Sequence, residues 1–223
     1  PMFSPTEAIN ELNYAVGELG FKAATSGTEV RLPVSQVAQH APELGKYTER
    51  VHPVALDGLY DYDPVWQRCV DLKIPVACHT AARGGGSRHS SPSNFVFNHL
   101  GGFSTAADFF CRSIFMDGVT RRFPDLNFAF LEGGVGWAVQ LYNDLFEHWE
   151  KRNIDFMRSN LDPGKLDTEL IRAMAAKYGD GILTGDALIG ESKTNRMGGI
   201  LKEEIELDEF RRCKIDKKED IRD

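Results

Sequence analysis

The chain alternates between short apolar segments and longer segments in which apolar residues recur at helical spacing. Residues 127–149 show this most completely: an aromatic and aliphatic segment predicts a buried strand, a run of glycines predicts a tight turn, and the periodic apolar residues that follow predict a helix. Near the start, the N-cap residue Ser4 and the following Pro5 predict a first helix, which Gly20 should end. Strand, turn and helix are therefore the expected building blocks.

The same alternation continues along the chain. Further strands are predicted at 21–25, 51–56, 74–78 and 181–186, while 29–47 is interpreted as a long connection. No glycine-rich dinucleotide-binding pattern follows the first strand. Repeated strand and helix alternation without that pattern favours a (β/α) barrel over a doubly wound sheet. Helices are expected between the strands, at 63–72, 94–100, 105–116 and 167–178.

Polar residues fall where several predicted strands end: Asp57, His79, Glu132 and Asp186. In a barrel these positions share the rim where α/β enzymes place their chemistry. His79 could be a metal ligand, a general base or a polar cap on the core. Glu132 and Asp186 could equally cap the helices that follow them. If they converge, imidazole and carboxylate groups would suit a divalent metal.

Candidate substrate contacts lie near these strand ends. Arg83 and Arg88 flank three glycines, a loop that could hold a carboxylate or phosphate, or could simply be flexible. His99 precedes two glycines and could contact substrate or serve the loop structure. Trp137, in the turn after Glu132, is the remaining substrate-binding candidate.

Composition narrows the function classes. The net charge of -7 and the lack of any basic run with interleaved aromatics argue against nucleic-acid binding. No apolar run approaches the roughly 18 residues of a membrane span, and the first residues do not resemble a signal peptide. The four cysteines lack metal-finger or CxxC spacing, which fits a reducing compartment. We expect a soluble, cytoplasmic protein with a small-molecule substrate.

Four segments, at 62–66, 74–79, 118–126 and 130–137, resemble the amidohydrolase-related proteins of the aminocarboxymuconate-semialdehyde decarboxylase type. The resemblance covers about residues 51–152 and implies a distorted (β/α)8 barrel, TIM-barrel-like in form. It also implies one divalent metal, commonly zinc with manganese as the alternative, held by a His-x-His pair and by residues matching His79 and Asp186. Glu132 takes the place where many members carry a histidine.

The sequence departs from that pattern in three respects. It contains no His-x-His pair, and its first recognisable strand resembles the barrel's third. Glu132 replaces a histidine, and the Gly-Ser-Asp ending of the family appears here at 184–187 as Thr-Gly-Asp-Ala, one residue short of register and without a following Pro-His. We therefore expect an α/β barrel domain over residues 1–201 that is incomplete at its N-terminus, followed by a charged C-terminal segment at 202–223. Unpaired barrel edges favour self-association, so a homodimer is expected.

The expected activity is that of a metal-dependent hydrolase or non-oxidative decarboxylase acting on a small carboxylate-bearing or cyclic substrate. Glu132 would position or deprotonate a metal-bound water, or the metal would stabilise the charge left by a departing carboxylate. Two other hypotheses remain open. One is a metal-independent enzyme of the same fold with Glu132 and His79 as an acid/base pair, and the other is a non-catalytic barrel homologue.

Overall fold

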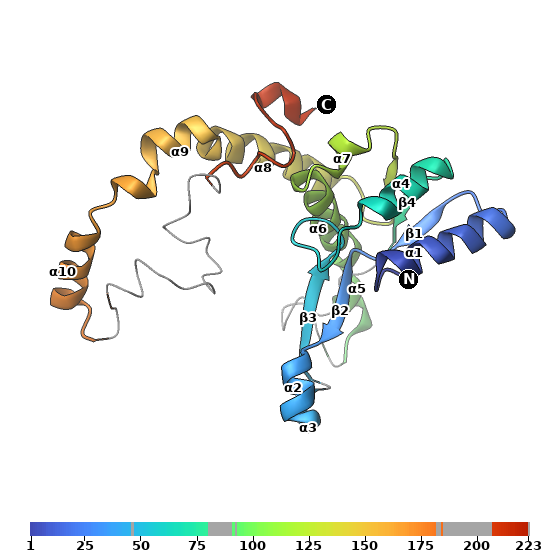
Figure 1. Cartoon of the computed structure of the whole chain (residues 1–223), viewed down its shortest axis with the longest axis horizontal. Coiled ribbons are helices and arrows are strands. Elements are labelled where there is room, and N and C mark those ends of the chain that lie inside the picture. The colour runs from blue at the N-terminus through green and yellow to red at the C-terminus, as the bar shows by residue number, and fades with distance from the viewer. Residues whose placement is uncertain (46, 80–90, 92, 182–183, 185–206, 223) are drawn as a thin grey trace. The chain divides into compact units, whose positions relative to one another are not determined.

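The computed structural model of the chain describes residues 1–45, 47–79, 91, 93–181, 184 and 207–222 (Figure 1). Two compact units can be distinguished. The first comprises Pro1–Asp144 and Arg212–Lys214, and the second comprises Leu145–Arg211 and Ile215–Asp223. The first unit holds all the strands of the described residues.

The first unit mixes helices and strands, which confirms the α/β class. Its elements in chain order are α1 (Pro5–Leu12), the π-helix η1 (Asn13–Glu18), β1 (Ala24–Ser26), β2 (Glu29–Pro33), α2 (Ser35–His40), α3 (Pro42–Gly45), β3 (Glu49–Pro53), α4 (Asp63–Asp71), β4 (Val76–Cys78), α5 (Phe95–His99), α6 (Gly102–Met116), α7 (Val119–Arg122), β5 (Phe128–Phe130) and the beginning of α8 (Gly136–Arg152).

The predicted start of the first helix is confirmed. The Oγ of Ser4 accepts a hydrogen bond from the backbone N–H of Glu7 at 3.3 Å and donates one to the Glu7 carboxylate at 3.0 Å. The helix runs on as a π-helix, and Gly20 follows it with a φ of 76°, the left-handed conformation that favours glycine.

Three strands form a parallel sheet in the order β1, β4, β5. Its register pairs Ala24 with Val76 and Val76 with Phe128. Because parallel strands end at the same edge, the chain segments after all three strands leave the sheet side by side. Within the described residues this sheet does not close into a barrel.

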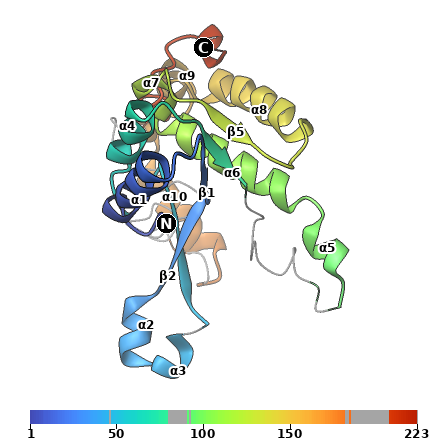
Figure 2. The same ribbon diagram turned by 90° about the vertical axis from the view of Figure 1, so that its right-hand side faces the viewer.

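Strands β2 and β3 pair antiparallel in a separate hairpin, with Val30 opposite His52. The prediction of a long connection at 29–47 was therefore wrong. Polar and apolar residues alternate in β2, as in a strand, but the prolines at 33 and 42 were interpreted as signs of an irregular segment. Pro33 ends β2, and Pro42 begins α3. Figure 2 shows α2 and α3 at the far end of this hairpin.

The pairing of β2 with β3 also shows that the predicted position of Asp57 at the rim was wrong. The strand at 51–56 is realised as β3, which belongs to the hairpin and not to the parallel sheet. Asp57 follows it with a φ of 56°. It therefore does not lie at the end of a strand of the parallel sheet.

The core of the first unit lies between the parallel sheet and helices α1, α4 and α6. Trp66 of α4 and Phe110 of α6 are almost completely buried, with ring centroids 6.4 Å apart. Trp66 also packs against Phe128 of β5 in a T-shaped arrangement, with ring centroids 5.8 Å apart. Burial raises the pKa of the Cys69 thiol to about 11, so this cysteine is a protonated apolar side chain at neutral pH.

An ionic network joins α4 to α7. The guanidinium of Arg122 donates to both carboxylate oxygens of Asp63, at 2.6 and 2.8 Å, and to the carboxylate of Asp117 at 2.8 Å. Arg212 donates to the other oxygen of Asp117 at 2.7 Å. These hydrogen bonds, that to Asp63 above all, raise the pKa of Arg122 above its ordinary value.

We expect Arg122→Lys to lower the free energy of unfolding by about 1–2 kcal/mol, because a lysine ammonium cannot bond both oxygens of Asp63 in the plane of the carboxylate. Urea unfolding of the variant measures this loss. Arg112→Lys is the matched control, since Arg112 makes a single exposed pair with Asp108, expected to contribute less than about 1 kcal/mol. Equal losses in both variants would show that the contacts of Arg122 contribute no more to stability than the single pair of Arg112 and Asp108.

The second unit is helical in its described part. It contains the end of α8, then α9 (Ile154–Asn160), a 3₁₀ turn at Pro163–Lys165, α10 (Thr168–Tyr178) and a 3₁₀ helix, η5, at Lys218–Ile221. The helix predicted at 167–178 is confirmed as α10, and Asp167 is its N-cap, accepting from the N–H of Leu170 at 2.9 Å. The predicted domain division at residue 201 lies outside the described residues and stays a prediction.

Candidate active site

Two of the predicted rim residues follow neighbouring strands of the parallel sheet. His79 comes directly after β4, and Glu132 follows β5 by two residues. The pairing of these strands continues past their ends, because the N–H of Leu131 donates to the carbonyl of Cys78 at 3.0 Å. The chain therefore delivers both side chains to the same edge of the sheet.

The two side chains are in direct contact. Nε2 of His79 lies 2.8 Å from Oε2 of Glu132, although the residues are 53 positions apart in the sequence. The imidazole is 46% exposed and the carboxylate 55% exposed. The pair is thus held by the fold and open to solvent.

Glu132 occupies an unusual backbone conformation. Its φ is 65°, in the left-handed region that costs a residue with a side chain about 1–2 kcal/mol. The indole Nε1 of Trp137 donates to the carbonyl of Gly134 at 2.9 Å, and its ring packs against Phe130 with centroids 5.0 Å apart. Trp137, predicted as a substrate contact, thus bonds the turn that carries Glu132.

Aromatic rings from α5 and α6 lie next to the imidazole of His79. Phe103 of α6 stacks on the imidazole with centroids 5.4 Å apart and planes 17° apart. His99 meets the same phenyl ring edge-on at 5.1 Å, and Phe95 stacks on His99 at 5.1 Å. The ring of Phe103 therefore contacts both His79 and His99. Within this stack His99 lies near the His79–Glu132 pair but does not contact it.

The sequence analysis did not identify Phe103 as a contact of His79. The position follows two glycines and precedes an amphipathic helix, a pattern that does not distinguish a core residue from a residue at the site. The remaining predicted site residues, Arg83, Arg88 and Asp186, lie outside the described residues.

The described residues do not by themselves make up a metal site. No group of three or more histidine, cysteine, aspartate or glutamate side chains gathers in the part of the chain that the structure describes. His79 and Glu132 supply two donors, fewer than the three protein ligands of catalytic zinc sites, and the imidazole nitrogen nearest the carboxylate is bonded to it. We therefore assign no step to a metal here.

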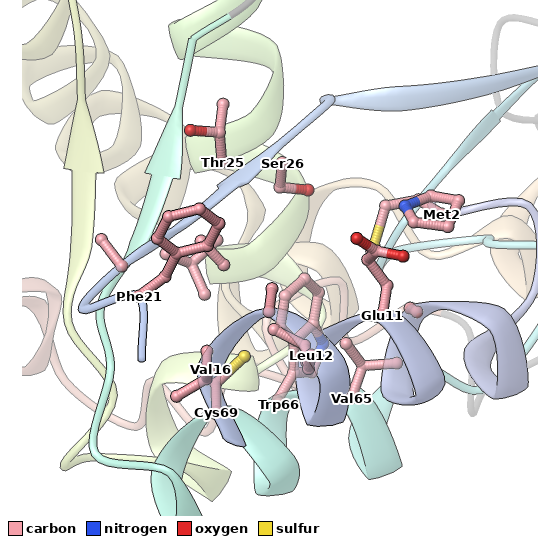
Figure 3. A pocket seen from close by; sticks show the side chains of 16 residues that line it. Met2, Glu11, Leu12, Val16, Phe21, Thr25, Ser26, Val65, Trp66 and Cys69 are labelled. Atoms are coloured by element: carbon pink, nitrogen blue, oxygen red, sulfur yellow. The ribbon is translucent and has the colours of Figure 1, made fainter. Parts of the chain in front are cut away.

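A separate apolar cavity of about 320 Å³ lies between α1, η1, β1 and α4. Figure 3 shows Leu12, Val16 and Trp66 among its walls, with Glu11 and Ser26 as polar members. Neither residue of the His79–Glu132 pair lines it. The cavity is therefore distinct from the candidate active site.

The fold and the pair define the class of protein: an α/β chain with an imidazole and a carboxylate in contact at the carboxyl edge of a parallel sheet, the position of active sites in such folds. The family model described as amidohydrolase matches residues 1–160. The chain therefore belongs to the amidohydrolase family, whose members are enzymes that typically use divalent metals.

A search of curated proteins finds none that matches the chain. Within the part of the chain that the structure describes, no helix combines the length and the apolar character that crossing a bilayer requires.

Proposed function

We propose that this chain is a hydrolase or non-oxidative decarboxylase of the aminocarboxymuconate-semialdehyde decarboxylase type, acting on a small carboxylate-bearing or cyclic substrate. The complete fold in this proposal is a (β/α)8 barrel, of which β1, β4 and β5 are neighbouring strands. The observation that carries the proposal is the 2.8 Å contact between His79 and Glu132 at the carboxyl edge of the sheet.

The contact supports a role for each of the two side chains. In this proposal Glu132 acts as a carboxylate, which can only accept hydrogen bonds, so Nε2 of His79 would carry the hydrogen between them. Nδ1 is then the basic nitrogen of the ring. Glu132 fixes this tautomer and stabilises the imidazolium that forms when Nδ1 takes a proton, the logic of an oriented base in hydrolytic enzymes.

One pair of this kind serves both reaction classes. In hydrolysis, Nδ1 removes a proton from the water that attacks a carbonyl carbon and returns it to the leaving group. In decarboxylation, Nδ1 first takes a proton from solvent. The electrons of the broken C–C bond then stay on the substrate carbon as carbon dioxide leaves, and the imidazolium gives its proton to that carbon, which restores the neutral imidazole. Arg83 or Arg88 would hold a substrate carboxylate in either case.

A panel of two substrate classes tests the proposal. Cyclic carboxylates are assayed for carbon dioxide release, and cyclic amides and lactones are assayed for ring opening, each with and without added zinc. We expect turnover in one class. A folded protein that turns over neither class, with or without zinc, would refute the proposed function.

A divalent metal, zinc or manganese, bound by His79 and Asp186 is the metal-dependent form of the proposal, and it depends on a residue outside the described part. In this form Nδ1 of His79 would hold the metal, and Glu132 in place of His79 would act as the base toward water. We expect chelation to abolish turnover and zinc to restore it, and Asp186→Asn to lower the zinc content of the purified protein. Asp180→Asn, a nearby aspartate at the end of α10, is the control. Turnover that survives chelation would instead assign the reaction to the His79–Glu132 pair alone.

A further inference from the structure

The ring of Phe103 stacks on the imidazole of His79. The two rings are nearly parallel, 17° apart, with centroids separated by 5.4 Å. An N–H of imidazole points within the plane of its ring, so the tilt of that plane decides where Nε2 points. Phe103 therefore stacks on a face of the imidazole, whereas Glu132 bonds the ring nitrogen Nε2.

Ser104, which follows Phe103 in α6, packs against the turn after Glu132. A Cβ added to Gly133 would lie 3.2 Å from Cα of Ser104 and 3.3 Å from its backbone nitrogen. That separation is shorter than ordinary van der Waals contact, so the absence of a side chain at Gly133 allows α6 to approach. The first turn of α6 therefore touches His79 through one residue and the Glu132 turn through the next.

This first turn is itself well fixed. Gly101 precedes it with a φ of 74°, and its carbonyl accepts hydrogen bonds from the hydroxyls of Ser104 and Thr105 at 2.9 and 2.8 Å. Ala106 and Ala107 are buried one turn further on. The helix start is thus anchored in the first unit and can act as a rigid support.

We propose that the first turn of α6 positions the His79–Glu132 pair, with Phe103 as the positioning residue for the imidazole. Phe103 acts through His79 and is not itself catalytic. This inference rests on the proposed function, because it assigns a support to the pair that performs the chemistry there.

The kinetic test compares three variants. Phe103→Leu keeps apolar volume but removes the ring, and we expect it to lower kcat about 10-fold to 100-fold with KM changed less than about twofold, since a displaced base costs rate more than binding. Phe103→Tyr keeps the ring and should retain activity. Phe97→Leu, at a phenylalanine of α5 that is 51% exposed, is the matched control and should behave as wild type.

A second readout needs no substrate, so it separates this inference from the proposed function. In wild-type protein, NMR should show a contact between the ring protons of His79 and Phe103 and an upfield ring-current shift of the His79 signals. Phe103→Leu should remove that shift and speed exchange of the Nε2 proton. Failure of every substrate would refute the proposed function and leave this measurement intact.

Three results would overturn the positioning role. The first is that NMR shows no contact between the two rings in wild type. The second is that Phe103→Leu matches wild type both in kcat and in its His79 signals. The third is that Phe103→Tyr is as impaired as Phe103→Leu. The wild-type contact and the tyrosine variant keep the test decisive even if the leucine variant fails to fold.

Discussion

Glu132→Gln is expected to lower kcat by about 10²-fold to 10⁴-fold, the range associated with removing one partner of a general acid/base pair. The glutamine amide is nearly the same size as the carboxylate, so the turn that carries it should persist. It has no negative charge to stabilise the imidazolium of His79, 2.8 Å away. Steady-state kinetics on whichever substrate class proves active, with KM reported beside kcat, measures the effect.

The matched control is Glu147→Gln, an exposed glutamate of α8 paired with Lys151, where no change in kcat is expected. His79→Ala and the double variant that combines it with Glu132→Gln complete a double-mutant cycle. Because the two side chains act as a unit, the double variant should lose little more than either single one. Losses that simply multiply would show that His79 and Glu132 work independently, which would contradict the proposed roles.

The local structure was predictable where local physics decides it. Ser4 and Asp167 cap helices by bonding backbone groups three residues away, and such contacts depend on adjacent sequence alone. The strands before His79 and Glu132 could be predicted for a similar reason, because buried apolar segments followed by polar residues are typical of α/β proteins.

The pairing of strands could not be predicted in the same way. The hairpin of β2 and β3 was mistaken for a connection followed by a strand of the sheet, because alternation over five residues is a weak signal beside the prolines at 33 and 42. Which strands are neighbours is decided by contacts distant in sequence, and the pattern of a single strand does not contain them.

The sequence identified residues of the candidate site but did not predict how their side chains contact one another. The sequence placed His79 and Glu132 on one rim, but their direct contact depends on β4 lying next to β5 and on the left-handed conformation of Glu132. The stacking of Phe103 on His79 likewise depends on where α6 begins relative to the sheet. A single sequence gives the identity of these side chains, whereas their distances are a property of the fold.

Phe110→Ala is expected to lower the free energy of unfolding of the first unit by about 3–5 kcal/mol, because it leaves a large cavity in a close-packed core. The side chain is 0% exposed, and its ring meets Phe128 and Phe130 of β5 at 5.9 and 6.2 Å. Domains are typically stable by only about 5–15 kcal/mol, so this loss would be a large fraction of the total.

Hydrogen exchange of the backbone amides in β4 and β5 is the suitable measurement, since it reports the first unit without assuming that both units unfold together. Phe97→Ala removes the same side chain from a position that is 51% exposed and should change the opening free energy by less than about 1 kcal/mol. Because β5 leads directly into the Glu132 turn, Phe110→Ala should also loosen the hydrogen bond between Glu132 and His79. A core variant no less stable than the exposed control would mean that Phe110 does not fill the space between α6 and the sheet.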